Sequence, residues 1–193
     1  PPQQQAEEPV RIEENVVVSA TKVEQQLINA PATITVIGPR TLDVAASQSY
    51  ADILRNVPGV NITQVSARDV NITPRGSTST LSNTQLAVLD GRSLYQDFFA
   101  FVMWDFMPVN LNELKRIEVI RGPASAIWGA NAMSGVVNVI TKTPREMLGT
   151  SVALGAGTFV TSSGAGEDDS GVLWYVNGTH AGVINDRASF KVS

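Results

Sequence analysis

The sequence predicts a small mixed α/β domain followed by antiparallel β-strands. Three observations predict this order. From residue 14 to residue 145, short alternating stretches are interleaved with short helix signals, which is typical of a mixed sheet covered by helices. After Pro144 the helix signals stop, and small residues alternate with apolar ones over longer stretches. The chain has 193 residues, 43% of them hydrophobic, which is enough for one core.

The composition excludes several classes of site. The net charge is -4 and no basic stripe could neutralise phosphates, so nucleic acid is not an expected partner. Without cysteine, the chain can form neither a disulfide framework nor a cysteine-based zinc site. His180 is the only histidine, so no histidine cluster could hold a metal, and we expect no cofactor. No run of about 18 apolar residues predicts a membrane-spanning helix.

The N-terminal segment over residues 1–13 is expected to be disordered. It is rich in Pro, Gln and Glu and shows no hydrophobic periodicity. It also lacks the apolar core of a signal peptide. The short β-branched run Val16–Val18 follows it.

The predicted elements of the first half are short. A strand over 33–37 stops at Gly38-Pro39. A helix over 49–56 has Ser49 as its N-cap, with Asp52 three residues later. Pro58-Gly59 ends this helix. Further strands are predicted over 60–63, 69–73 and 86–89, the last of them closed by the turn pair Asp90-Gly91.

Residues 110–145 carry the densest structural signals. Asn110 is expected to cap a short helix over 111–114. Charged and apolar side chains alternate over 116–120, so we expect one buried face and one polar face. Gly122-Pro123 opens a second short helix, with proline at its favoured first position, and Gly129 ends it. A final strand is predicted over 136–141, closed by Thr143-Pro144.

Long alternating stretches replace this pattern after residue 145. Strands are predicted over 150–157, 172–180 and 188–192, with a turn over 164–171 whose acidic residues are expected to be hydrated. Small residues, aromatic residues and long alternation are typical of strands in an outer-membrane barrel. A soluble β-meander would show the same pattern. We place the domain boundary near residue 145.

Four ordered motifs resemble the TonB-dependent receptor family. Residues 111–142 are similar to its plug signature, including the run Arg116-Ile-Glu-Val-Ile-Arg-Gly-Pro123. The other three motifs are Ile53–Val60, Pro74–Gly76 and Leu89–Arg92. The resemblance covers residues 14–145. It implies a TonB-box-like segment over 14–20, a plug domain over 21–145, and the first strands of an incomplete outer-membrane barrel over 146–193.

The resemblance also implies a function. Members of this family import scarce, bulky nutrients such as ferric siderophores, cobalamin or haem across the outer membrane. Their plug fills a barrel of about 22 strands. The expected partners are a TonB-type energy-transducing protein and a small-molecule nutrient or metal chelate, with the N-terminus in the periplasm. Residues 146–193 suffice for two or three strands, whereas a closed membrane barrel needs at least about 8, so we expect the complete transporter to be longer.

One candidate partner-binding segment resembles the TonB box. An extended, β-branched segment can add as a strand to the edge of a partner's sheet. An ordinary first strand of the domain is the alternative. The residues of this segment are Glu14, Asn15, Val16, Val17, Val18, Ser19 and Ala20.

The resemblance also singles out two arginines. Arg75 and Arg121 each precede a glycine in a family motif, and their counterparts face inward and pair with glutamates of the barrel wall. A buried guanidinium needs such a partner, because leaving it unpaired costs several kcal/mol. Glu118 is the local candidate for a partner. The alternative is that both arginines are solvated.

The segment 95–107 is unusually aromatic for a loop that follows a turn. In the family, plug loops face the outside and touch the substrate. The alternative is that these side chains pack in the plug core or against the barrel, because large apolar residues rarely stay exposed together. The candidates are Tyr95, Phe98, Phe99, Phe101 and Trp104.

The sequence predicts a transport receptor and no enzyme. Ser19-Ala-Thr-Lys22 has the S-x-x-K spacing of penicillin-binding enzymes, but that motif requires a helix, and Ser19 follows a β-branched run. Pro144 also replaces the glycine of the K-T-G motif. Two other functions remain alternatives: a soluble plug-like binding module, and a signal-transducing receptor of the same family.

Overall fold

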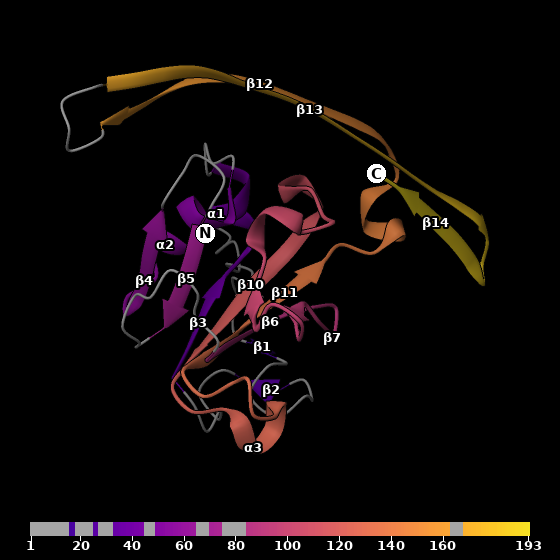
Figure 1. Cartoon of the computed structure of the whole chain (residues 1–193). Coiled ribbons are helices and arrows are strands. Elements are labelled where there is room, and N and C mark those ends of the chain that lie inside the picture. The colour runs from indigo at the N-terminus through magenta and orange to yellow at the C-terminus, as the bar shows by residue number, and fades with distance from the viewer. Residues whose placement is uncertain are drawn as a thin grey trace, which may run out of the picture.

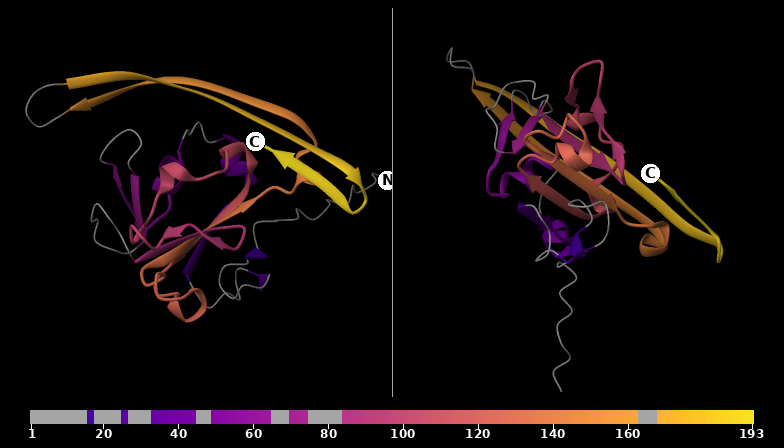
Figure 2. Two further views of the ribbon diagram at one scale, coloured as in Figure 1. Left: turned by 45° about the vertical axis from the view of Figure 1, so that its right-hand side comes forward. Right: turned by 90° about the horizontal axis from the view of Figure 1, so that it is seen from below.

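The computed structural model describes residues 16–17, 25–26, 33–44, 49–64, 70–74, 84–162 and 168–193. These residues form a body built on a mixed β-sheet and a long β-hairpin that runs along one side of it (Figures 1 and 2). Within these residues, no helix has both the length and the apolar character that crossing a membrane requires.

The central sheet has five strands in the order β3-β10-β11-β6-β7. Strand β10 pairs antiparallel with both β3 and β11, whereas β11 pairs parallel with β6. The predicted mixed sheet is therefore present. Its strands are β3 (Thr33–Ile37), β10 (Leu114–Arg121), β11 (Gly135–Thr141), β6 (Gln85–Leu89) and β7 (Arg92–Ser93).

Shorter elements surround this sheet. The helices are α1 (Pro39–Val44), α2 (Tyr50–Arg55) and α3 (Ser125–Trp128), with the 3-10 helices η3 (Trp104–Phe106), η4 (Leu111–Glu113) and η5 (Pro144–Met147). Three small antiparallel pairs join β1 (Val16–Val17) to β2 (Gln25–Gln26), β4 (Val60–Gln64) to β5 (Val70–Pro74), and β8 (Tyr95–Gln96) to β9 (Phe101–Val102).

Hydrophobic side chains bury both faces of the central sheet. On one face, Ile117, Val119 and Val137 pack in the larger cluster with residues of α2, β5 and η3. On the other face, Ile120, Val136 and Val88 form a smaller cluster that Trp128 of α3 packs against. The core therefore lies on both sides of β10 and β11.

The prediction of a polar face for β10 is wrong. Glu118 is completely buried, as are Ile117 and Val119 on the opposite face. Both faces of β10 are buried because this strand lies between β3 and β11 and a hydrophobic cluster covers each face of the sheet. Glu118 is paired within the protein, as its Oε1 accepts from Nε of Arg116 at 2.7 Å.

Several local predictions are confirmed. Ser49 caps α2, where its hydroxyl accepts from the backbone N of Asp52 at 3.3 Å. Asp90 and Gly91 both have positive φ, 47° and 83°, and link β6 to β7 in a tight turn. Positive φ at both central residues is the geometry that joins twisted antiparallel strands with least strain.

Two predicted helix starts are wrong in detail. The helix after Asn110 is a single 3-10 turn, and the Asn110 side chain makes no cap bond to it. Its amide instead donates to Glu113 Oε1 at 3.2 Å, because that carboxylate is buried beside it. Pro123 precedes α3, which begins at Ser125 and ends at Trp128, with Gly129 as its C-cap as expected.

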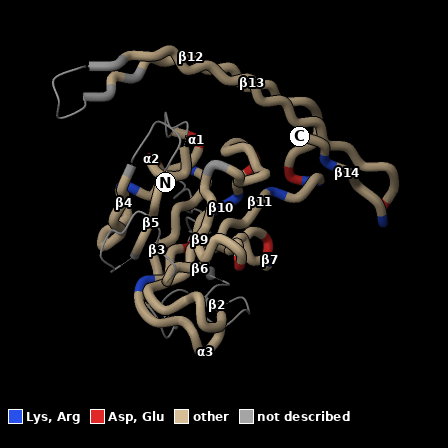
Figure 3. Tube along the Cα trace, viewed as in Figure 1, with Lys and Arg blue, Asp and Glu red and all other residues tan. Residues whose placement is uncertain are grey.

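The long hairpin comprises β12 (Gly149–Ser162) and β13 (Asp168–Asn185), and β14 (Ala188–Val192) adds a third antiparallel strand. Both hairpin strands are longer than predicted. No lysine, arginine, aspartate or glutamate occurs in 149–162 or 170–185, so most of the hairpin is uncharged (Figure 3).

The two faces of the hairpin differ. One face exposes apolar side chains, among them Val152, Leu154, Val172, Trp174 and Val176. The opposite face carries Ser151 and Thr179, which bond to the sheet body, so this face is directed inward. The inward residues of β12 from 151 to 157 are small. At Gly155 the Tyr175 ring lies so close that an added Cβ would be 2.1 Å from it.

Candidate functional site at the junction of sheet and hairpin

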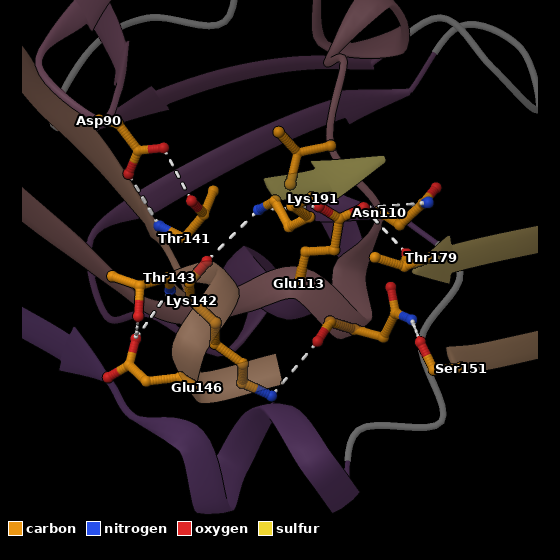
Figure 4. Close-up of polar contacts among 12 residues, drawn as sticks. Asp90, Asn110, Glu113, Thr141, Lys142, Thr143, Glu146, Ser151, Thr179 and Lys191 are labelled. Atoms are coloured by element: carbon orange, nitrogen blue, oxygen red, sulfur yellow. Dashed lines mark hydrogen bonds and ion pairs between the residues drawn. The ribbon is translucent and has the colours of Figure 1, made fainter. Parts of the chain in front are cut away.

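A buried carboxylate lies where the central sheet meets the long hairpin. Glu113, the last residue of η4, is only 2% exposed. It lies next to Leu114, the first residue of β10, and its backbone O accepts from Lys142 N at 2.8 Å beyond the end of β11. The sheet body therefore presents this carboxylate to the strands that follow (Figure 4).

Side chains from three other segments surround the Glu113 carboxylate. Nζ of Lys191, on β14, lies 3.0 Å from Oε2. Thr179, on β13, donates to Oε1 at 3.3 Å, and Asn110 donates to the same oxygen. Both oxygens are thus occupied, and Lys191 and Thr179 belong to the three-stranded sheet.

These contacts stabilise the ionised carboxylate. Burial by itself raises the pKa of Glu113, but hydrogen bonds from Ser193, Lys191 and Thr179 and the charge of Lys191 together bring that pKa below its ordinary value. The Tyr50 hydroxyl donates to Val109 O at 3.0 Å, and burial together with the charge of Glu113 raises its pKa. The site therefore holds a charged Glu113 beside a neutral Tyr50.

Lys142 adds two hydrogen bonds to the junction, and each of them has a backbone oxygen as its acceptor. Its Nζ donates to Asn112 O at 3.2 Å, and its own backbone O accepts from Nζ of Lys191 at 3.3 Å. Lys191 thus bonds to the sheet body at two points. Asn112 Nδ2 also donates to Ser151 Oγ on β12 at 3.2 Å.

The link η5 between the two sheets is itself fixed. Thr143 and Glu146 form a capping box, in which the Glu146 carboxylate accepts from Thr143 N at 2.7 Å and from its hydroxyl. Lys115 of β10 lies 2.5 Å from Glu146 Oε1. The hydrogen bond from Lys115 is the largest cause that lowers the pKa of Glu146 to about 2, and the hydrogen bonds from Thr143 add to it. Arg145 donates to the backbone oxygens of Asn185 and Asp186 in the β13–β14 turn.

The arrangement sets the orientation of the strands on the sheet body. A buried ion pair is geometrically demanding, and removing one partner costs about 3–5 kcal/mol because the other charge stays buried. Because the charged groups of this junction are paired with one another, their role is to fix the position of the strands on the sheet body. Within the described part of the chain, no cluster of three or more acidic or histidine side chains could hold a metal.

Sequence reasoning missed this junction. The capping box had a readable signal, because Thr143-Pro-Arg-Glu146 matches the S/T-x-x-E pattern. Glu113, Thr179 and Lys191 had none. They lie on separate elements, and Thr179 is 66 residues from Glu113 in the sequence.

The two predicted plug–barrel contacts that the structure describes lie on opposite faces of β10. Glu118 lies on the face of the smaller cluster, where it pairs with Arg116 and Asn138. Arg121 lies on the face of the larger cluster, in line with Ile117 and Val119, and its Nη1 donates to Pro58 O at 2.6 Å. The structure thus pairs Glu118 with Arg116. Arg75 lies outside the described residues.

The aromatic segment is divided between surface and core. Phe98 is 92% exposed and Phe99 53% exposed, and their rings meet edge to face at 5.0 Å. Phe99 also contacts Phe101, which is half-buried. Trp104 is buried in the larger core cluster near Tyr50, with ring centroids 6.2 Å apart, and Tyr95 packs against the same cluster. Of the five candidates, Phe98 and Phe99 are the exposed ones, and Phe106 of the same segment is exposed as well.

The box-like segment is described only in part. Val16 and Val17 form β1 and pair with Gln26 and Gln25 of β2. Its other residues, Glu14, Asn15, Val18, Ser19 and Ala20, lie outside the described residues, as does the segment 1–13.

Curated proteins of one kind match the chain. Residues 26–136 match the family model described as the TonB-dependent Receptor Plug Domain. The vitamin B12 transporter BtuB of Vibrio vulnificus (strain CMCP6) is 33% identical over 151 residues, which are 77% of this chain and 24% of that protein. The iron-regulated outer membrane virulence protein of Vibrio cholerae is 31% identical over 197 residues, covering 97% and 28%. The chain therefore spans about a quarter of the length of these relatives.

Solved structures agree with this match. The siderophore receptor PirA from Pseudomonas aeruginosa superposes with a TM-score of 0.55 at 26% identity, covering 84% of this chain and 27% of that chain. PirA from Acinetobacter baumannii gives 0.56 at 25% identity, with 82% and 23% covered. The predicted fold class, a mixed sheet with short helices followed by antiparallel strands of an unclosed barrel, is confirmed.

Proposed function

Since the chain belongs to the TonB-dependent receptor family, whose plug-domain model matches residues 26–136, we propose that the complete protein imports a scarce nutrient across the outer membrane. The chain is part of an outer-membrane receptor of this family. In the proposed role it supplies the plug and the first strands of the barrel, and it carries out no catalysis.

One observation carries this proposal. The sheet body that matches the plug family is bonded through Glu113 to strands whose opposite face is apolar and exposed. An outward apolar face suits the hydrocarbon of a membrane, and the inward face holds the plug. A plug held in a barrel closes the pore, so transport requires the plug to move or rearrange.

The energy for this movement has to come from outside the outer membrane, and we assign its delivery to the segment 14–20. A TonB-type partner would pair with this segment as an added strand. The similar proteins suggest two classes of nutrient. BtuB is a vitamin B12 transporter, and PirA is a siderophore receptor. We therefore expect cobalamin or a ferric siderophore as the cargo.

Growth and uptake of a deletion strain test the nutrient. A strain lacking the complete gene is supplied with labelled cobalamin or with a panel of labelled ferric siderophores, each limiting for growth. Restored uptake of one nutrient by the complete gene, lost again when a protonophore is added, is the expected result. Uptake that persists with the protonophore would reject energised import, and no response to any nutrient would favour the soluble binding module.

The partner segment is tested by Val17→Pro. Proline removes a backbone donor and blocks strand pairing, so uptake by the complete receptor should fall to the level of the deletion strain while nutrient binding to cells persists. Val17→Ile, which keeps the donor and the β-branched shape, is the matched control and should transport normally. Normal uptake by the proline variant would remove this segment from the mechanism.

A further inference from the structure

A histidine interrupts the apolar outward face of the hairpin, at the end of β13 where β14 is added (Figure 1). The strand registers place His180 beside Thr150 of β12 and Val192 of β14. Paired residues point to the same face of a sheet, and successive residues of a strand point to opposite faces. Since Thr179 bonds inward to Glu113, the next residue, His180, points outward, and its side chain is exposed.

The imidazole ring of His180 is held from two sides. Oγ1 of Thr150 lies 2.8 Å from its Nδ1. The ring of Phe190 packs against it, with centroids 5.7 Å apart. Phe190 is itself fixed across Gly182, where an added Cβ would lie 2.8 Å from the phenyl ring. These contacts orient the imidazole and leave Nε2 as its free nitrogen among the described residues.

The distance from Ser170 to His180 matches the thickness of a membrane. Both residues lie on the outward face of β13. The outward residues between them are apolar or glycine, namely Val172, Trp174, Val176 and Gly178. Ten steps along the strand rise about 33 Å, which at a tilt of about 40° spans about 25 Å, the height of the apolar band of a membrane barrel. The two polar residues therefore mark the two edges of this band.

The turn beyond His180 places its edge on the periplasmic side. Only Asp186 and Arg187 join β13 to β14, whereas the link from β12 to β13 runs from Ser162 to Asp168. Outer-membrane barrels have short turns on the periplasmic side and longer loops on the outside. Lipid at the periplasmic edge is phospholipid, whose headgroup carries a phosphate.

We propose that His180 binds the phosphate of a phospholipid headgroup in the periplasmic leaflet, with Thr150 and Phe190 as positioning residues. A phosphate diester offers only acceptors, so it selects the tautomer with the proton on Nε2, and the Thr150 hydroxyl then donates to Nδ1. No carboxylate occurs in residues 170–185 to compete for that proton. The site goes beyond the proposed function, because it requires the outward face to meet lipid and does not involve the nutrient.

Native mass spectrometry of the complete receptor in detergent tests this site. The receptor is titrated with phosphatidylethanolamine and with a diacylglycerol of the same chains, which lacks the phosphate. His180→Phe keeps a ring beside Phe190 but removes the donor, so its affinity for phosphatidylethanolamine should fall about tenfold, the effect of losing one hydrogen bond to a charged group. Its affinity for diacylglycerol should not change. Val176→Ala, in the middle of the same face, is the control and should bind both lipids as the original receptor does.

Three results would overturn the proposal. One is equal affinity of the original receptor and His180→Phe for phosphatidylethanolamine. Another is equal affinity of the original receptor for the two lipids, because the contact would then be apolar only. The third is displacement of the phospholipid by inorganic phosphate at equal concentration, which would indicate a site for free anions.

Thr150→Val gives an independent measurement should His180→Phe fail to fold. It removes the hydroxyl that orients the imidazole, so the affinity for phosphatidylethanolamine should fall severalfold, and an unchanged affinity would also reject the site. His180→Gln, which keeps an N–H donor, should retain more of the affinity than His180→Phe. These titrations contain no nutrient, so a failed uptake assay rejects the proposed function and leaves the lipid site to be judged by itself.

Discussion

At the scale of single residues, the molecule relies on a few buried charges. Glu113 and Glu118 are both fully or almost fully buried, and each has a basic partner, Lys191 and Arg116 respectively. The difference lies in where the partner is. Arg116 is on the same strand as Glu118, whereas Lys191 belongs to a separate sheet, so only the Glu113 pair holds two bodies together.

Substitutions at this pair should be strongly coupled. In the complete receptor, Lys191→Met should lower the free energy of unfolding by about 3–5 kcal/mol, because it leaves Glu113 charged and buried. The double variant Glu113→Gln with Lys191→Met should recover part of this loss. Urea unfolding of the two single variants and the double variant measures the coupling.

The exposed pair between Lys115 and Glu146 supplies the control. Its side chains are 40% and 39% exposed, so Lys115→Met should cost no more than about 1 kcal/mol. Equal costs for Lys115→Met and Lys191→Met would show that burial of Glu113 is unimportant.

The aromatic segment leads to a second prediction about single residues. Trp104→Ala should cost about 3–5 kcal/mol, because a buried aromatic side chain is removed from the core. Phe98→Ala should change the free energy of unfolding by less than about 0.5 kcal/mol, because this ring is exposed. If the tip of this segment contacts the nutrient, Phe98→Ala should weaken nutrient binding out of proportion to stability. Unchanged affinity in a titration would assign the tip no role in binding.

At the scale of elements, the long hairpin shows how alternation follows from its environment. Leu154 and its outward neighbours are apolar although they are exposed, while the inward residues of β12 from 151 to 157 are small. In water this pattern would be unfavourable, since a large exposed apolar surface promotes association. Facing lipid, the same pattern is expected.

Arginine on the outward face tests this environment. Leu154→Arg should destabilise the complete receptor in a lipid bilayer by about 2–4 kcal/mol, as arginine does near the membrane midplane. Ser170→Arg, on the same face near the hairpin tip, should cost only about 0–1 kcal/mol. Equal, small effects at both positions would favour a hairpin that lies in water, as in a soluble β-meander.

The sequence predicted those features that depend only on neighbouring residues in the chain. The Ser49 cap, the Asp90-Gly91 turn and the alternation of β12 and β13 all depend on neighbours in the chain, and the structure contains each of them. The burial of Glu118 and the pairing of Glu113 with Lys191 depend on which strands lie beside them. No local pattern contains that information, so the polar face predicted for β10 was wrong and the junction was missed.

At the scale of the whole molecule, we propose that the boundary between plug and barrel lies at residue 145, within η5. This short link is held from both sides, because Lys115 of β10 bonds to Glu146 and Arg145 bonds to the β13–β14 turn. The link between the two bodies therefore depends on the Glu146 carboxylate, whose pKa is lowered.

Acid should loosen this link at a predictable pH. Glu146 has a pKa lowered from 4.5 to about 2, so its stabilising contribution is complete above about pH 4.5 and is lost as the pH falls through about 2. Glu113 shifts in the same direction. Pepsin should therefore cut the complete receptor between residues 142 and 150 near pH 2 and spare it near pH 4.5.

A single variant should move this pH dependence. Glu146→Gln removes the titrating group, so cleavage between residues 142 and 150 should already occur near pH 4.5. Asp43→Asn, an exposed change on α1, is the control and should behave as the original chain does. Cleavage of the original chain at both pH values would contradict the assigned role of Glu146.

The position of β3 in the sheet has a mechanical consequence. β3 is the strand of the central sheet nearest the N-terminus, and within the described residues it pairs only with β10, through five register pairs from Thr33 to Ile37. Tension applied from the N-terminal side reaches the pair of Thr33 and Arg121 first, and peeling away from β10 breaks the backbone bonds in sequence rather than all at once. The force needed is then that of one or two bonds, and the work is spread over a long displacement. β3 would therefore detach from β10 before the tension reached β11, β6 or the ion pair of Glu113.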